Sequence, residues 1–196
     1  MSLLLEPYSL RQLIFPNRIA VSPMCQYSSV DGLANDWHLV HLGSRAVGGA
    51  GLIFTEATAV TADGRITAQD LGLWDDQHIE PLQRITRFIR AQGAVAGIQL
   101  AHAGRKASTH RPWLGKHGSV KVEEGGWVPV GPSPIAFDPQ HTAPTQLDEG
   151  QIQDVIQAFV DAAKRALEAG FSVVEVHAAH GYLLHQFLSP LSNQRR

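Results

Sequence analysis

The chain has 196 residues, of which 44% are hydrophobic and 17% charged, and its formal net charge is −2. This is the composition of an ordinary globular protein with a sizeable core, and the near-neutral charge gives no electrostatic basis for binding nucleic acid or an anionic membrane surface. The single cysteine excludes an internal disulfide. No stretch has the length of a membrane span and the first residues lack a signal-peptide pattern, so we expect a cytoplasmic protein that does not bind membranes.

Strand-like and helix-like patterns alternate through the first half of the chain. Short apolar runs rich in β-branched residues predict buried strands, and apolar residues at helical spacing predict amphipathic helices. The expected elements are a strand over residues 18–23, a helix with Asp36 as its N-cap that stops at Gly48, a strand over 51–60, a helix that follows Asp75 and closes at Gly93, and a strand over 94–101.

The second half begins with a segment rich in proline and glycine, over about residues 103–147. It is too long for a plain connection between a strand and a helix, so we expect an excursion that caps one end of the domain. The clearest helix follows: Asp148 and Gln151 have the spacing of a capping box, and Gly170 stands at the C′ position. A strand over 171–177 and a helix through Leu184 come next.

This order predicts an α/β fold with a parallel sheet. A Gly-x-Gly-x-x-Gly motif does not follow the first strand, so the sequence lacks the main signature of a dinucleotide-binding Rossmann fold. The rhythm fits about the first four units of a (β/α)8 TIM barrel, with residues 1–196 as the N-terminal part of that single domain. Half a barrel leaves two sheet edges unpaired, so we expect a homo-oligomer or association with the missing C-terminal half.

Chemically distinctive residues stand at the carboxyl end of every expected strand. Because those ends meet on one side of a parallel sheet, we expect one site there. In chain order these residues are Ser22, Pro23, Met24, Cys25 and Tyr27 after the first strand, Glu56 and Ala57 at the second, Gln99, His102 and Arg105 at the third, and His177, His180 and Tyr182 at the fourth.

Two chemistries suit the pair His177 and His180. The His-x-x-His spacing can bind zinc, as in a zinc-dependent barrel hydrolase, but only Glu56 and Glu175 supply carboxylates nearby, so we expect no metal. Two neutral imidazoles can instead donate hydrogen bonds to one carbonyl oxygen, and Tyr182 could deliver a proton. This second pattern predicts reduction or enolisation of a carbonyl compound, although the chain could also be an inactive half-barrel that needs a partner.

Three segments resemble the Old Yellow Enzyme family of flavin-dependent ene-reductases: residues 17–27 (NRIAVSPMCQY), 99–106 (QLAHAGRK) and 177–182 (HAAHGY). The cysteine after Pro23 and Met24 is typical of the bacterial branch that includes the xenobiotic reductases and the thermophilic-like members. The resemblance implies a (β/α)8 barrel that holds FMN without a covalent bond. It also implies that NAD(P)H reduces the flavin, which passes a hydride to an α,β-unsaturated carbonyl or nitro compound.

The resemblance also assigns roles to individual residues. The substrate carbonyl would be bound by His177 and His180, Tyr182 would protonate the α-carbon, and Tyr27 would line the substrate pocket. The residues implied to contact the flavin ring are Ser22, Pro23, Met24, Cys25, Ala57 and Gln99. The residues that grip the FMN phosphate are expected in the C-terminal half. A relative with an added iron–sulfur cluster, such as a dienoyl-CoA reductase, remains an alternative on the same fold.

Overall fold

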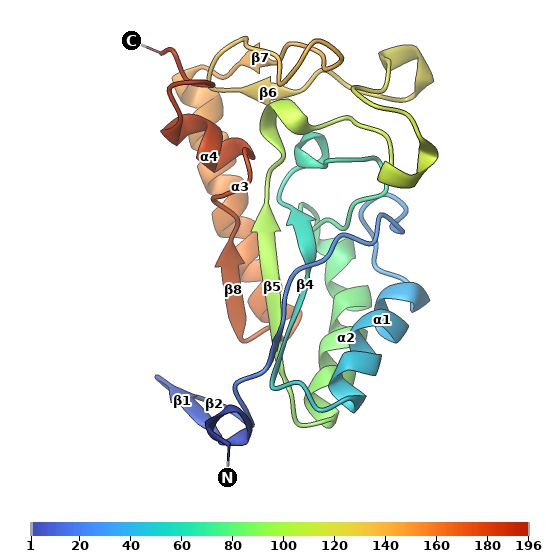
Figure 1. Cartoon of the computed structure of the whole chain (residues 1–196), viewed down its shortest axis with the longest axis vertical. Coiled ribbons are helices and arrows are strands. Elements are labelled where there is room, and N and C mark those ends of the chain that lie inside the picture. The colour runs from blue at the N-terminus through green and yellow to red at the C-terminus, as the bar shows by residue number, and fades with distance from the viewer. Residues whose placement is uncertain (1, 196) are drawn as a thin grey trace.

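The computed structural model of the chain describes residues 2–195, and its centre is a parallel sheet with the strand order β3-β4-β5-β8 (Figure 1). The spatial order of these strands is their order along the chain, and a helix lies between each strand and the next. The expected alternation of strands and helices is therefore confirmed. The strands are β3 (Ala20–Val21), β4 (Leu52–Ala59), β5 (Val95–Ala101) and β8 (Val173–Val176).

The connecting helices pack against the sheet through apolar stripes. In α2, the predicted spacing of Leu82, Ile85 and Ile89 places all three side chains in the core with Ile53 and Ile98 of the sheet. Burial of each such side chain contributes about 1.5–3 kcal/mol. Within residues 2–195, no helix combines the length and apolar composition needed to cross a membrane. The helices are α1 (Asp36–Val47), α2 (Ile79–Ala91), α3 (Glu149–Glu168) and α4 (Leu183–Leu188).

Helix α3 begins and ends as its sequence predicts. The Asp148 carboxylate accepts a hydrogen bond from the Gln151 backbone N–H at 2.8 Å, and the Gln151 side chain accepts one from the Asp148 N–H at 2.9 Å. At the other end, Gly170 has φ of +88°, a conformation that L side chains rarely adopt. The capping box and the C′ glycine are both confirmed.

Two expectations for the first part of the chain were wrong. The N-cap of α1 is Asn35 rather than Asp36, because the Asn35 backbone is extended and its side chain accepts a hydrogen bond from the Trp37 N–H. The strand expected over residues 18–23 has ladder pairing with β4 only at Ala20 and Val21. Beyond Val21 the chain leaves the sheet, and Pro23 has no N–H with which to continue the ladder.

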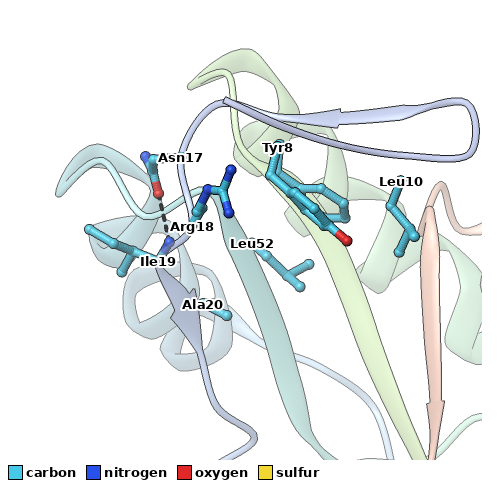
Figure 2. A pocket seen from close by; sticks show the side chains of 8 residues that line it. Tyr8, Leu10, Asn17, Arg18, Ile19, Ala20 and Leu52 are labelled. Carbon is cyan, nitrogen blue, oxygen red and sulfur yellow. Dashed lines mark hydrogen bonds between the residues drawn. The ribbon is translucent and has the colours of Figure 1, made fainter. Parts of the chain in front are cut away.

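An antiparallel hairpin that the sequence did not predict precedes the sheet. Strands β1 (Tyr8–Leu10) and β2 (Leu13–Phe15) turn at Arg11, whose positive φ of 54° occurs without a glycine or asparagine signal. Figure 2 shows the hairpin at the amino ends of the central strands, where Tyr8, Leu10 and Leu52 line a hollow of about 390 Å³. This hollow lies at the end of the sheet opposite to the histidine motif.

Residues 103–147 run across the carboxyl end of the sheet, where they form the short parallel pair β6 (Val130–Gly131) and β7 (Thr145–Gln146) (Figure 1). Backbone carbonyls accept the hydrogen bonds that fasten this excursion. The Arg105 guanidinium donates to the carbonyls of Ile135 and Ala136 at 3.3 Å. The Trp127 indole N–H donates to the carbonyl of Asp63 at 2.8 Å. The excursion is therefore held directly above the strand ends.

An apolar groove of about 530 Å³ lies beyond β8, between α3 and α4. Its walls include Ile156, Phe159, Val176, Phe187 and Leu188. Several of these side chains are largely exposed, among them Ile156 at 51% and Leu188 at 77%. A patch of this kind is typical of a surface that another element covers.

The His102 side chain predicts how stability changes with pH. Its Nδ1 accepts a hydrogen bond from the Gly104 N–H at 3.0 Å, and complete burial lowers its pKa from 6.5 to about 4. Between these values the unfolded chain binds a proton that the folded chain excludes, so the contribution of His102 to stability falls as the pH falls. Burial raises the pKa of Asp70 to about 7, which acts in the opposite direction over the same range. We expect the contribution of His102 to the free energy of unfolding to be lower by about 2 kcal/mol at pH 5 than at pH 7, measured by urea denaturation as the difference between the unmodified protein and His102→Gln.

The slope of the unfolding free energy against pH, rather than its value at one pH, tests whether His102 makes this contribution. His102→Gln should make the free energy of unfolding rise more, or fall less, as the pH is lowered from 6.5 to 4, because the titrating imidazole is gone. The exposed His117, replaced by Gln, is the matched control and should leave the slope unchanged. An unaltered slope in His102→Gln would show that other groups cause the pH dependence.

Candidate active site

The register of the central sheet places the predicted site residues side by side. Ala57 of β4 lies opposite Gln99 of β5, and Gln99 lies opposite Glu175 of β8. The ladder continues at His177, whose backbone N–H donates to the carbonyl of Leu100 at 2.9 Å. Backbone pairing alone therefore aligns one residue from each of three strands across the carboxyl end of the sheet.

Gln99 and Glu175 form the polar part of this row. The Gln99 amide nitrogen donates to the Glu175 carboxylate at 2.6 Å, and Gln99 is only 7% exposed. This bond fixes the orientation of the amide and leaves the Gln99 carbonyl oxygen as a free acceptor toward the site. Beside it, the small and buried Ala57 leaves room above β4.

The segment from Ser22 to Tyr27 approaches the same end of the sheet from β3. Burial, followed by the charges of Asp70 and Glu56, raises the pKa of the Cys25 thiol to about 12, so the thiol stays protonated at neutral pH. Tyr27 has a positive φ of 49°, and burial also raises the pKa of its phenol. A neutral thiol is a poor nucleophile and a weak hydrogen-bond donor.

His177, His180 and Tyr182 form a compact cluster after β8. The imidazole ring of His177 meets the ring of His180 at 5.2 Å and that of Tyr182 at 5.0 Å, both edge to face. Burial, and then the neighbouring His180, lower the pKa of His177, which favours its neutral form. Burial raises the pKa of Tyr182 to about 12, so the phenol keeps its proton at neutral pH. The cluster thus combines two imidazole rings, of which His177 favours the neutral form, with a protonated phenol.

Three other residues flanking the site differ in exposure. Ser22 is exposed, Pro23 is half-buried, and Met24 is 45% exposed although its side chain is apolar. His102 is buried and hydrogen-bonded to the backbone of Gly104, so it is part of the framework of the excursion rather than the cluster.

The sequence interpretation gave no role to Lys106. Its ammonium lies 4.8 Å from the centre of the Tyr182 ring and donates to the carbonyl of His180 at 3.0 Å. It therefore holds the loop that carries His180 and places a positive charge beside the phenol. Lys106 belongs to the QLAHAGRK segment, and its position after the end of β5 was the signal that could have identified it.

The residues at this end of the sheet have the chemistry to contact a flat heteroaromatic ring system with one apolar and one polar edge. Pro23, Met24 and the small side chain of Ala57 offer apolar contacts. Gln99 offers an oriented amide, and His177 offers imidazole nitrogens. The isoalloxazine ring of a flavin has this division of edges. Among the residues described, no group of three or more His, Cys, Asp or Glu side chains is gathered as a metal site.

Comparisons with known proteins also point to a flavin-dependent enzyme. The model of the NADH:flavin oxidoreductase / NADH oxidase family matches residues 3–196. The NADH:flavin oxidoreductase FG08077 of Gibberella zeae is 53% identical over 96% of this chain and 46% of its own length. The NADPH dehydrogenase of Bacillus subtilis is 47% identical over 98% of this chain and 53% of its own length.

Solved structures give the same result. The Old Yellow Enzyme homologue of Zymomonas mobilis superimposes with a TM-score of 0.82 at 26% identity, over 98% of this chain and 53% of that one. This likeness confirms the β/α barrel as the fold class. The chain spans about half the length of the relatives it matches. The chain belongs to the NADH:flavin oxidoreductase / NADH oxidase family, which includes the Old Yellow Enzymes that its motifs resemble.

Proposed function

We propose that the protein is an FMN-dependent ene-reductase that uses NAD(P)H to reduce the C=C bond of α,β-unsaturated carbonyl or nitro compounds. The observation that carries the proposal is the cluster of His177, His180 and Tyr182 beside a surface that suits a flavin ring. Family membership supports the flavin and the nicotinamide co-substrate. The cluster supports the choice of substrate class, because it can bind an oxygen and deliver a proton near it.

The histidine pair binds and polarises the activating group of the substrate. A neutral imidazole donates one hydrogen bond through its N–H, and two such donors converge on the carbonyl or nitro oxygen. The lowered pKa of His177 keeps this ring neutral. Negative charge that develops on the oxygen strengthens both bonds, so the pair stabilises the transition state more than the bound substrate.

Tyr182 supplies the proton to the α-carbon. Bound FMN, once reduced by NAD(P)H, would supply the hydride to the β-carbon. Because burial raises its pKa to about 12, Tyr182 holds its proton until the carbon becomes basic enough to take it. The ammonium of Lys106, 4.8 Å from the Tyr182 ring, lies where it lowers the cost of the phenolate left behind.

Tyr27 forms the outer wall of the substrate pocket. Its ring meets that of Trp113 edge to face at 5.6 Å, and Trp113 comes from the excursion above the sheet. The two aromatic side chains offer an apolar surface of the kind that suits an enone or a nitroalkene.

We also propose that further β/α units complete the barrel beyond β8 and beyond β3. Both strands are sheet edges, and the apolar groove next to β8 includes Phe187 and Leu188. An uncovered edge with an apolar face is an association surface. The length of the relatives supports further units of this kind, and a second copy of the chain is the alternative occupant.

Flavin binding is the first test of the proposed function. Purified protein is incubated with FMN and passed through a gel-filtration column while its visible absorption is recorded. We expect a flavin band that elutes with the protein, with a spectrum that changes when NADPH is added without oxygen. Protein that elutes colourless would contradict the proposed cofactor site in this chain.

Tyr182→Phe should separate the two half-reactions. In the flavin-loaded protein we expect reduction of the flavin by NAD(P)H to change less than twofold. Its reoxidation by an enone should slow by about 10²-fold, because the general acid is lost. Rapid mixing with each substrate measures both rates. Tyr8→Phe, on the hairpin at the opposite end of the sheet, is the control, and equal slowing of both half-reactions would refute the role of Tyr182.

His177→Ala should weaken the binding of compounds that offer an oxygen to the histidine pair. We expect the Kd of a simple phenol, read from the change in flavin absorption, to rise by about tenfold, as for the loss of one hydrogen bond of about 1.4 kcal/mol. His117→Ala, a change on the exposed part of the excursion, should leave this Kd unchanged. An unchanged Kd in His177→Ala would remove this residue from substrate binding.

A further inference from the structure

The segment Met24–Ser28 carries Cys25 and Tyr27 but belongs to no strand or helix. Its backbone therefore lacks the regular ladder that fixes Ala57 and Gln99 in neighbouring strands. Tyr27 also adopts a positive φ of 49°, which disfavours any residue with a side chain. Such a conformation persists only where surrounding contacts determine it. The contacts that do so come from residues to which the proposed reaction gives no role.

The central contact is a buried carboxylate on β4. Glu56 Oε2 accepts a hydrogen bond from the Gln26 backbone N–H at 2.9 Å, between Cys25 and Tyr27 in the sequence. Glu56 Oε1 lies 3.2 Å from Nε2 of His38, and the two side chains are only 2% and 1% exposed. Each carboxylate oxygen therefore has its own partner, as a buried carboxylate requires.

His38 is itself held in one orientation. The backbone N–H of Asn35 can only donate, and it meets His38 Nδ1 at 3.1 Å. The same nitrogen lies 3.0 Å from the Asn35 side-chain oxygen, so Asn35 holds this edge of the ring and Nε2 faces Glu56. Ser29 Oγ, 3.3 Å from Nε2, completes the surroundings of the ring.

The first turn of α1 adds contacts to the same segment. The Asn35 side-chain amide donates to the carbonyl of Ser28 at 2.7 Å, and the Trp37 indole N–H donates to the Gln26 side-chain oxygen at 3.0 Å. The Gln26 amide in turn donates to the carbonyl of Met24 at 2.7 Å. Helix α1 and Glu56 thus grip the segment from two sides.

Packing alone does not require this arrangement. A buried carboxylate–imidazole pair carries a desolvation cost, and well-packed apolar side chains often stabilise a core as much or more. What an apolar pair cannot provide is an acceptor for the Gln26 N–H or a negative charge near the Cys25 thiol. These are the two effects by which the pair acts on the site.

We propose that Glu56, oriented by His38, is a positioning residue that fixes the backbone of Met24–Ser28 and so sets the places of Cys25 and Tyr27. Its negative charge adds to burial and to the charge of Asp70, the larger causes, in favouring the protonated Cys25 thiol. The groups that act on this thiol are Asp70, Glu56 and Tyr27, and Asp70 is the other nearby carboxylate. The measurement of FMN binding rests on the proposed function, whereas the measurement of Cys25 alkylation does not.

Two substitutions separate the charge from the hydrogen bond. Glu56→Gln removes the charge but keeps an oxygen that can accept the Gln26 N–H. Glu56→Ala removes both. Cys25 is the single cysteine in the chain, so its alkylation by iodoacetamide, followed by mass spectrometry against pH, reports its thiolate fraction directly.

We expect Glu56→Gln to shift the pH profile of Cys25 alkylation, followed from pH 7 to pH 9.5, toward lower pH and to raise the alkylation rate at pH 9 by at least about threefold. The Kd for FMN should change less than twofold in this variant, whereas Glu56→Ala should raise it by about fivefold or more. Glu80→Gln, on the exposed face of α2, is the matched control and should change neither quantity.

A purely structural role predicts a different pattern. Glu56→Gln and Glu56→Ala would then lower the Tm while the pH profile of Cys25 alkylation in the folded protein stayed unchanged, and that result would overturn the proposal. If Glu56→Ala does not fold, the near-isosteric Glu56→Gln decides the question through the same pH profile. Absence of FMN binding by the unmodified protein would contradict the proposed flavin site in this chain but leave the alkylation result interpretable.

Discussion

The register of the parallel ladder from β4 to β8 is the constraint on which the site depends. Once Ala57 is opposite Gln99 and Gln99 is opposite Glu175, the carboxyl ends of these strands have no freedom to slide. A shift of one residue would turn each side chain to the other face of the sheet. The β4–β5 ladder shifts register once, between Phe54 and Ala57, and is regular from Ala57 to Ala59, where the site begins.

Helices and their ends could be predicted from the sequence where a signal within a few residues determined them. The box of Asp148 and Gln151, the glycine at 170 and the stripe of α2 each express a rule that acts within a few residues. The hairpin turn at Arg11 escaped prediction because it occurs without Gly or Asn. The N-cap was misplaced by one residue because Asn35 and Asp36 are both good caps, and only the backbone conformation distinguishes them.

The candidate site, too, could be predicted from the sequence only in part. The strand ends predicted which residues would gather, because topology brings them together whatever their side chains do. Sequence could not predict that Lys106 lies against Tyr182 or that Glu56 accepts the N–H of Gln26, since both contacts join segments far apart in the chain. His102 differs, because its partner Gly104 is only two residues away; its position at a strand end did not distinguish a side chain in the site from one that turns to the local backbone.

The hydrogen bonds that hold the excursion in place affect which substitutions this fold can tolerate. Arg105 and Trp127 attach the excursion through carbonyl groups of the main chain, which every amino acid supplies. Substitutions between these points can accumulate without loss of the acceptors, so this stretch can drift over generations while the barrel framework is preserved. Because Trp113 of this stretch touches Tyr27, drift there alters the pocket wall before it alters the reactive cluster. A mutant library confined to the exposed residues around Trp113, with Lys106 kept, would explore substrate range on an unchanged reactive cluster.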